Sequence, residues 1–183
     1  RDSNRPPRPA DISVRGRVLS PSDRLRYSPG SLLLIVSPSI AERDRFAERL
    51  IEDRASFFSL AKVRTLITGR VPDDVLDDKA AELLLAAVTK RLQSGETVVV
   101  ALEGLGAEER EIYVRPAAML KRPRHLILLE GSRDSVAEED RPPLNELRRA
   151  LDAGDLGAEG IQTSLRLGGA TLTRRRLGAI RPR

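Results

Sequence analysis

Short, uninterrupted aliphatic runs alternate along the chain with longer segments in which hydrophobic residues recur every three or four positions. The runs lie at residues 32–36, 97–102 and 125–130, and such runs are typical of strands that are buried on both faces of a sheet. Helical spacing is clearest over residues 72–93, which begin with a proline and end just before Gly95. The alternation predicts an α/β domain with a mostly parallel sheet flanked by helices.

Weaker patterns predict the remaining elements. Three further helices are expected at residues 40–54, 107–121 and 144–151. Phe57, Phe58 and Leu60 indicate a short second strand, and the pair Leu66-Ile67 is interpreted as a buried contact. Residues 161–167 and 170–173 flank two glycines, which favours a hairpin between them. Residues 131–143 are polar and predict a loop.

The distribution of proline and arginine divides the chain into three parts. Residues 1–29 are rich in both and predict an extended arm or linker, within which the alternating residues 11–19 are a possible edge strand. Residues 30–174 carry the aliphatic runs and form the predicted domain. Residues 175–183 form a basic tail.

Composition narrows the possible functions. The 183 residues are 40% hydrophobic and 32% charged, as in a globular protein, and no apolar run is as long as a membrane span, so we expect a cytoplasmic protein without a membrane partner. The chain has no cysteine and one histidine, which excludes thiol catalysis and makes us expect no metal site. A net charge of +5 suits an acidic partner such as nucleic acid, although aromatic residues for base stacking make up only 3%.

Residues 31–50 contain the most informative pattern, a buried strand followed by a short turn and an amphipathic helix. This arrangement holds phosphates in P-loop proteins. Where the pattern G-x-x-x-x-G-K-[ST] would stand, this chain has SPSIAERD, without either glycine. The residues in position to contact a nucleotide are therefore Ser37, Ser39, Arg43 and Asp44. Arg43 stands at the lysine position, and Asp44 replaces the hydroxyl that would hold magnesium.

Residues 95–130 (GETVVVALEGLGAEEREIYVRPAAMLKRPRHLILLE) extend this interpretation to a family. Together with residues 32–50 and 144–167 they resemble the small bacterial P-loop kinases of the polynucleotide-kinase-like, or zeta-toxin-like, family. The resemblance covers about three quarters of the chain. It implies a three-layer P-loop NTPase-like domain, and in intact family members it implies Mg-ATP as the bound cofactor.

The chain departs from the family where the resemblance places the active site. The family's Asp-x-x-Arg falls on residues 61–64, where alanine replaces the aspartate and Arg64 is kept. The family's polar D-A-T-N stretch falls on residues 101–104, with Glu103 as its one charged residue. The lid is shortened, and the lid-like candidates for contacting phosphate are Arg133 and Arg141.

Three hypotheses follow from these observations. The first is a catalytically inactive kinase-like (pseudokinase) domain without catalytic residues or cofactor, which serves as a scaffold, assembly or regulatory module for a protein partner or for other domains of a longer chain. The second is a divergent ATP-dependent kinase of the polynucleotide-kinase type, in which Arg43 replaces the lysine and Asp44 or Glu103 holds magnesium. The third is a nucleic-acid-binding module that uses arginine-rich arms, and its strongest basic cluster is Arg174, Arg175, Arg176, Arg181 and Arg183.

Overall fold

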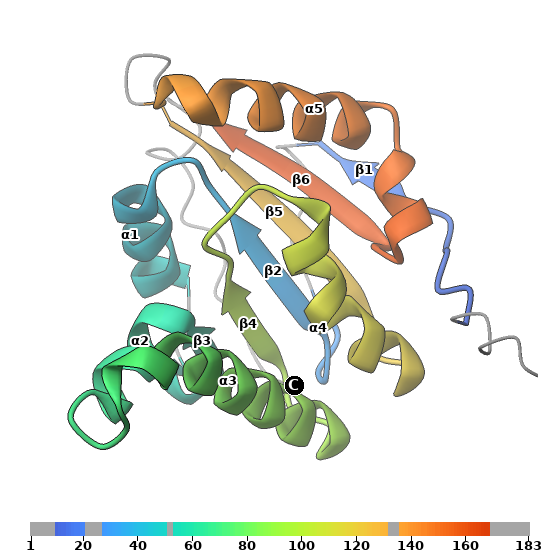
Figure 1. Ribbon diagram of the computed structural model, residues 1–183. Helices are drawn as coiled ribbons and strands as arrows, with labels where there is room; N and C mark the ends of the chain where they lie inside the picture. Colours follow the sequence, from blue (N-terminus) through green and yellow to red (C-terminus); the bar gives the residue numbers. More distant parts are fainter. Residues whose placement is uncertain (1–9, 21–26, 51–52, 132–135, 169–183) are drawn as a thin grey trace, which may run out of the picture.

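Six strands form a single parallel sheet in the computed structural model, which describes residues 10–20, 27–50, 53–131 and 136–168 (Figure 1). The strands are β1 (Arg17–Leu19), β2 (Leu32–Val36), β3 (Phe57–Ser59), β4 (Val98–Ala101), β5 (Arg124–Glu130) and β6 (Thr163–Gly168). Their order across the sheet is β1-β6-β5-β2-β4-β3, and all five pairings are parallel. The parallel sheet and the possible edge strand within residues 11–19 are thereby confirmed.

Helices cover both faces of the sheet. They are α1 (Ile40–Leu50), α2 (Leu60–Ile67), α3 (Leu76–Gln93), α4 (Ala107–Met119) and α5 (Arg141–Asp152). The described ranges also contain the 3-10 segments η1 (Arg54–Ser56), η2 (Asp73–Val75), η4 (Glu138–Asp140) and η5 (Asp155–Glu159). Helices α3, α4 and α5 pack on one face of the sheet, and α1 packs on the other (Figure 1).

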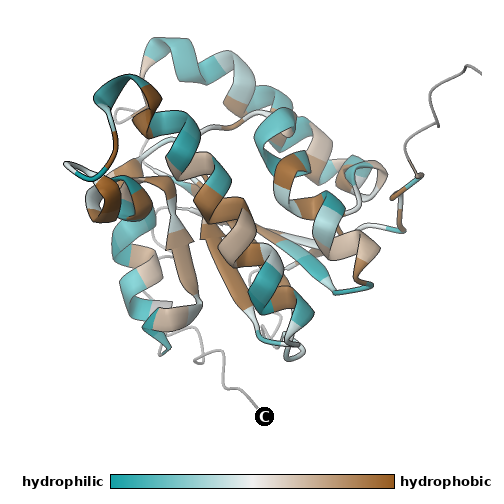
Figure 2. Ribbon diagram, turned by 60° about the horizontal axis from the view of Figure 1, so that its bottom comes forward, coloured by the Kyte–Doolittle hydropathy of each residue, from teal (hydrophilic) through white to brown (hydrophobic). Residues whose placement is uncertain are grey.

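The central strand β2 shows why the aliphatic runs predicted buried strands. Leu32, Leu34 and Val36 join the core under α3, α4 and α5, whereas Leu33 and Ile35 join the core under α1. All five side chains are at most 1% exposed. Because successive side chains of a strand point to opposite faces, only a strand covered on both sides is aliphatic at every position. Figure 2 shows the central strands as mostly hydrophobic and the surrounding helices as mixed.

One prediction about local structure is wrong. Leu66 and Ile67 do not form a buried contact, because they end helix α2, and the Leu66 side chain is 64% exposed. Ser59 begins this helix by accepting a hydrogen bond from the Lys62 N–H at 3.1 Å. Of the predicted hairpin, residues 163–168 form β6, which pairs in parallel with β5 and, through Thr163–Leu165, with β1. Residues 170–173 themselves lie outside the described residues.

The start of α5 differs from prediction for an identifiable reason. α5 begins at Arg141, three residues earlier than expected, with prolines at the next two positions. Proline is tolerated in the first turn because its missing N–H has no partner there. α4 contains Pro116 and ends at Met119.

The N-terminal arm packs against the domain through its backbone. The Val14 N–H donates to the Gly157 carbonyl at 2.8 Å, and the Arg17 N–H donates to the Gln162 carbonyl at 2.8 Å. Gly16 and Gly157 lie so close together that a Cβ on either would contact the backbone of the other. Residues 10–19 are thus part of the folded domain instead of a separate linker, while residues 1–9 and 21–26 lie outside the described residues.

His125 lies near the start of β5 in an enclosed position. Its Nδ1 is 2.6 Å from Thr163 Oγ1, and its ring centroid is 4.6 Å from that of Tyr27. Burial, together with the positive charge of Arg124, lowers the pKa of His125 to about 4. The folded chain therefore favours the neutral imidazole at pH 7.

This lowered pKa predicts a loss of stability in mild acid. The unfolded chain binds a proton with a pKa near 6.5 and the folded chain with a pKa of about 4, so the unfolded state holds more protons between these values. The contribution of neutral His125 to the free energy of unfolding is fully present above about pH 6.5. It is lost as the pH drops toward 4, and the total loss is about 3 kcal/mol. Urea unfolding at pH 7 and pH 5 measures this fall. Because the chain has one histidine, His125→Gln should reduce the pH dependence, and an unchanged slope would contradict the assignment.

Candidate functional site

The carboxyl ends of the strands form the candidate site. Because every strand is parallel, all six ends lie along one edge of the sheet. The chain leaves β2 through α1 to build β3 and β4 on one side, and it then passes β2 again to build β5 and β6 on the other. Ligands of open α/β sheets bind at this edge, next to the strand where the order reverses.

The turn between β2 and α1 is only three residues long, and its serines cap the helix. The Ser39 hydroxyl oxygen accepts a hydrogen bond from the Glu42 N–H at 3.3 Å, and the Ser37 hydroxyl oxygen accepts one from the Ser39 N–H at 3.1 Å. The Glu42 N–H belongs to the first turn of α1, and the Ser39 N–H lies directly before it, where a P-loop would hold phosphate. Both predicted serines therefore contact the chain's own backbone.

Arg43 is buried beneath this turn, and its guanidinium has partners within the chain. Its side chain is 2% exposed, and Nη1 donates to the Leu102 carbonyl at the end of β4 at 2.6 Å. Nε and Nη2 both donate to Asp44 Oδ1, at 3.2 and 3.1 Å. The two residues that stand in for the P-loop lysine and hydroxyl thus bind each other, and the arginine joins α1 to the neighbouring strand.

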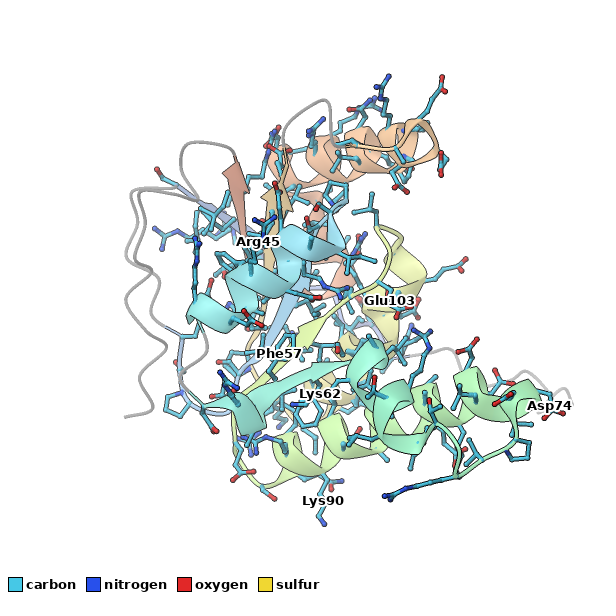
Figure 3. The ribbon with its side chains drawn as sticks, turned by 90° about the vertical axis from the view of Figure 1, so that its left-hand side faces the viewer. Arg45, Phe57, Lys62, Asp74, Lys90 and Glu103 are labelled. Carbon is cyan, nitrogen blue, oxygen red and sulfur yellow. The ribbon has the colours of Figure 1, made fainter. Side chains whose placement is uncertain are left out.

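Arg64 is neutralised by two carboxylates. Its Nη1 and Nη2 donate to the two Glu103 oxygens at 2.5 and 3.2 Å, and its Nε donates to Asp77 Oδ1 at 2.8 Å. These hydrogen bonds, above all the one to Glu103, raise the pKa of Arg64. Figure 3 shows Glu103 beyond the end of β4, facing the helices α2 and α3 that carry Arg64 and Asp77. The Arg64 guanidinium is therefore held by carboxylates of the chain itself.

The loop after β4 holds a second internal anion. The Glu109 side chain, from the first turn of α4, accepts hydrogen bonds from the Glu103 N–H at 3.0 Å and the Gly104 N–H at 2.8 Å. Consecutive backbone N–H groups that converge in this way are a common binding site for anions. Here the carboxylate of the chain itself occupies the position.

A further carboxylate, Glu130, ends β5 and joins two arginines. The Arg148 Nε donates to Glu130 Oε1, and the Arg166 Nη2 is 3.0 Å from both Glu130 oxygens. Arg166 also donates to Asp152 at 2.6 Å. The Glu130 side chain is 15% exposed, so the two arginines are held by a largely buried acid. Sequence reasoning missed this cluster, because its members are 18 and 36 residues apart along the chain.

Among the other predicted site residues, Arg141 is the one that the structure describes. Arg141 is exposed at the first position of α5. Arg133 and the C-terminal cluster Arg174, Arg175, Arg176, Arg181 and Arg183 lie outside the described residues. Within the described ranges, no group of three or more histidine, aspartate or glutamate residues is placed to hold a metal ion, and none of the helices is both long and apolar enough to cross a membrane.

Comparison with known proteins does not assign the chain to a family. No protein-family model matches the sequence, and no curated protein matches it. The function of the site must therefore be inferred from its geometry. Four arginines at or beside this edge, Arg43, Arg64, Arg148 and Arg166, all bind oxygen atoms of the chain itself.

Proposed function

We propose that this chain is a catalytically inactive kinase-like domain that serves as a scaffold, assembly or regulatory module for a protein partner. One observation supports the proposal most strongly. Donors that could bind a phosphate at the carboxyl edge of the sheet instead bind oxygen atoms of the chain itself. They are the Glu42 N–H in the first turn of α1, the Glu103 and Gly104 N–H groups after β4, and the Arg43 guanidinium.

The kinase-like part of the proposal is supported by the arrangement of the elements. A parallel sheet covered on both faces, with a buried strand leading through a tight turn into α1, is compatible with a P-loop NTPase-like domain. The resemblance of residues 95–130 to polynucleotide-kinase-like proteins points in the same direction.

The proposed lack of kinase activity is supported by the structure of the turn between β2 and α1 and by the contacts of Arg43. Phosphoryl transfer depends almost entirely on positioning and electrostatic stabilisation of the phosphates. A three-residue turn that is already capped leaves no loop to close around a triphosphate. To use Arg43 as a phosphate ligand, the chain would have to break its hydrogen bonds to Leu102 and Asp44 and leave a buried carbonyl without a donor, which costs about 1–3 kcal/mol. The geometry therefore disfavours the alternative of an ATP-dependent kinase.

A thermal-shift measurement tests the proposal. We expect Mg-ATP, Mg-GTP and ADP at millimolar concentration to leave the melting temperature unchanged, beyond the effect of sodium chloride at the same ionic strength. A ligand at 100 times its Kd would stabilise the fold by about 2.7 kcal/mol, which is a rise of roughly 5–10 °C for a chain of this size. A rise of that size that disappears in Arg43→Ala would contradict the proposal and favour the kinase alternative.

A further inference from the structure

Two arginines at the amino edge of the sheet have no carboxylate partner in the described part of the chain. Arg124 begins β5, and Arg122 lies two residues before it. The helices α3 and α4 both end beside this edge, at the lower right of Figure 1. Every other described arginine that is buried or half-buried is paired with a carboxylate of the chain itself. Arg122 and Arg124 are the exceptions to this pattern.

The Arg122 guanidinium lies against two tight turns. Its Nε donates to the Leu92 carbonyl, near the end of α3, at 2.9 Å. Nη1 and Nη2 are 3.3 and 3.5 Å from the positions that a Cβ would take on Gly30 and Gly95, whose φ angles are 80° and 75°. No described residue provides an acceptor for either Nη. The half-buried guanidinium is thus held through Nε, and its two Nη groups are placed to bind both oxygens of one carboxylate.

Positive charge continues on both sides of Arg122 along the chain. Arg124 is 6% exposed and donates to two main-chain carbonyls, at 2.6 and 2.8 Å. Burial lowers the pKa of Arg124, because its charge is removed from water without an anion beside it. Lys121 is exposed and directly precedes Arg122. A buried charge without a counter-ion destabilises the folded state, so an anion bound at this edge would offset part of that cost.

Arg91, in the last turn of α3, contributes a loosely held cation to the same turns. It donates to the Thr97 carbonyl at 3.3 Å, and the Thr97 hydroxyl oxygen accepts a hydrogen bond from the Gly30 N–H at 3.1 Å. Its two carboxylate partners, Glu96 and Asp53, are exposed and lie 3.4 and 3.8 Å away. Its buried Nε has no partner among the described residues. With both carboxylates included, the charged groups around these turns remain net positive.

We propose that Arg122, together with Lys121, binds a carboxylate from an acidic segment of a protein partner. A carboxylate is favoured over a phosphate because the negative ends of the α3 and α4 dipoles lie at this edge, and they oppose a dianion more strongly than a monoanion. The inference rests on the proposed function only in taking a protein as the source of the carboxylate. Arg43 and the carboxyl edge take no part in it, so the nucleotide experiment and the experiment below fail independently.

Titration of the whole chain with capped hexaglutamate tests the proposal, with capped hexaglutamine as the uncharged control. We expect hexaglutamate to shift the amide NMR resonances of Gly30 and Gly95 and to leave that of Gly104, at the carboxyl edge, in place. Arg122→Gln should lower the affinity at least about tenfold, because it removes a charged pair of hydrogen bonds. Arg149→Gln removes the same charge from an exposed position on α5 and should lower the affinity less than about twofold.

Lys121→Gly separates binding from folding. Lys121 follows the C-cap of α4 with a φ of 56°, a conformation that glycine ordinarily supplies at the end of a helix. The variant should therefore keep or raise the melting temperature while it lowers the affinity for hexaglutamate about threefold. Equal affinities of Arg122→Gln and Arg149→Gln would overturn the proposal. Shifts spread over both edges of the sheet, or tighter binding of inorganic phosphate than of hexaglutamate, would overturn it as well.

Discussion

Replacing Arg43 by alanine is expected to lower the free energy of unfolding by about 3 kcal/mol. The substitution removes the buried guanidinium that donates to the Leu102 carbonyl at 2.6 Å, and it opens a cavity between α1 and β4. A buried carbonyl without its donor costs about 1–3 kcal/mol, and the missing side-chain atoms add to this loss. The variant also removes a charge from the interior, which offsets part of the cost. In urea the expected change is a fall in the unfolding midpoint of about 1.5 M.

Two control variants test whether the loss of stability is specific to the Arg43 guanidinium. Arg45 lies on the same helix but is exposed, and it contacts the Ala41 carbonyl of its own helix at 3.4 Å, so Arg45→Ala should change stability by less than about 0.5 kcal/mol. Arg43→Lys keeps the charge and one donor group, and we expect an intermediate loss. If Arg43→Ala and Arg45→Ala were equally mild, the guanidinium would not join α1 to β4 as described.

The central strands could be predicted because each consists of consecutive aliphatic residues, which indicate burial on both faces of the sheet. β2, β4 and most of β5 are aliphatic at every position, since both faces of each strand are covered. α2 was missed for the opposite reason. Its hydrophobic residues are only half-buried or exposed, and eight residues give too few turns for helical periodicity to distinguish it from an apolar contact.

Features of the site could be predicted from the sequence only where the residues involved are close together along the chain. The loss of both glycines from the P-loop position is visible in the sequence, and so is the pattern Ser39-x-x-Glu42, a helix-capping signature that already indicates a turn closed by its own side chains. The binding of Arg43 to Leu102 joins residues 59 positions apart, and no periodicity reports such a contact. The pairing of Arg64 with Glu103, 39 positions apart, was hidden for the same reason.

Replacing Gly157 by alanine is expected to destabilise the domain by about 2 kcal/mol and to detach the N-terminal arm. A Cβ at this position would meet the Gly16 amide nitrogen and the Val14 carbonyl oxygen at less than van der Waals contact. Both are backbone atoms, so the clash is relieved only if the arm moves away from η5. That movement breaks the hydrogen bond from the Val14 N–H to the Gly157 carbonyl. Overpacking of this kind costs about 1–3 kcal/mol.

Gly106→Ala is the matched control for Gly157→Ala, because a Cβ on Gly106 meets nothing within 4 Å and its φ of −83° suits any residue. Because Gly106 is the N-cap of α4, where alanine is less favourable than glycine, we expect this control to lose no more than about 1 kcal/mol. Hydrogen exchange at the Val14 amide distinguishes a detached arm from general destabilisation, because the Val14 N–H should lose protection in Gly157→Ala while the amides of β2 keep theirs. Unchanged protection at Val14 would mean that the close approach of the two glycines does not hold the arm, and β1 would then depend on its pairing with β6 alone.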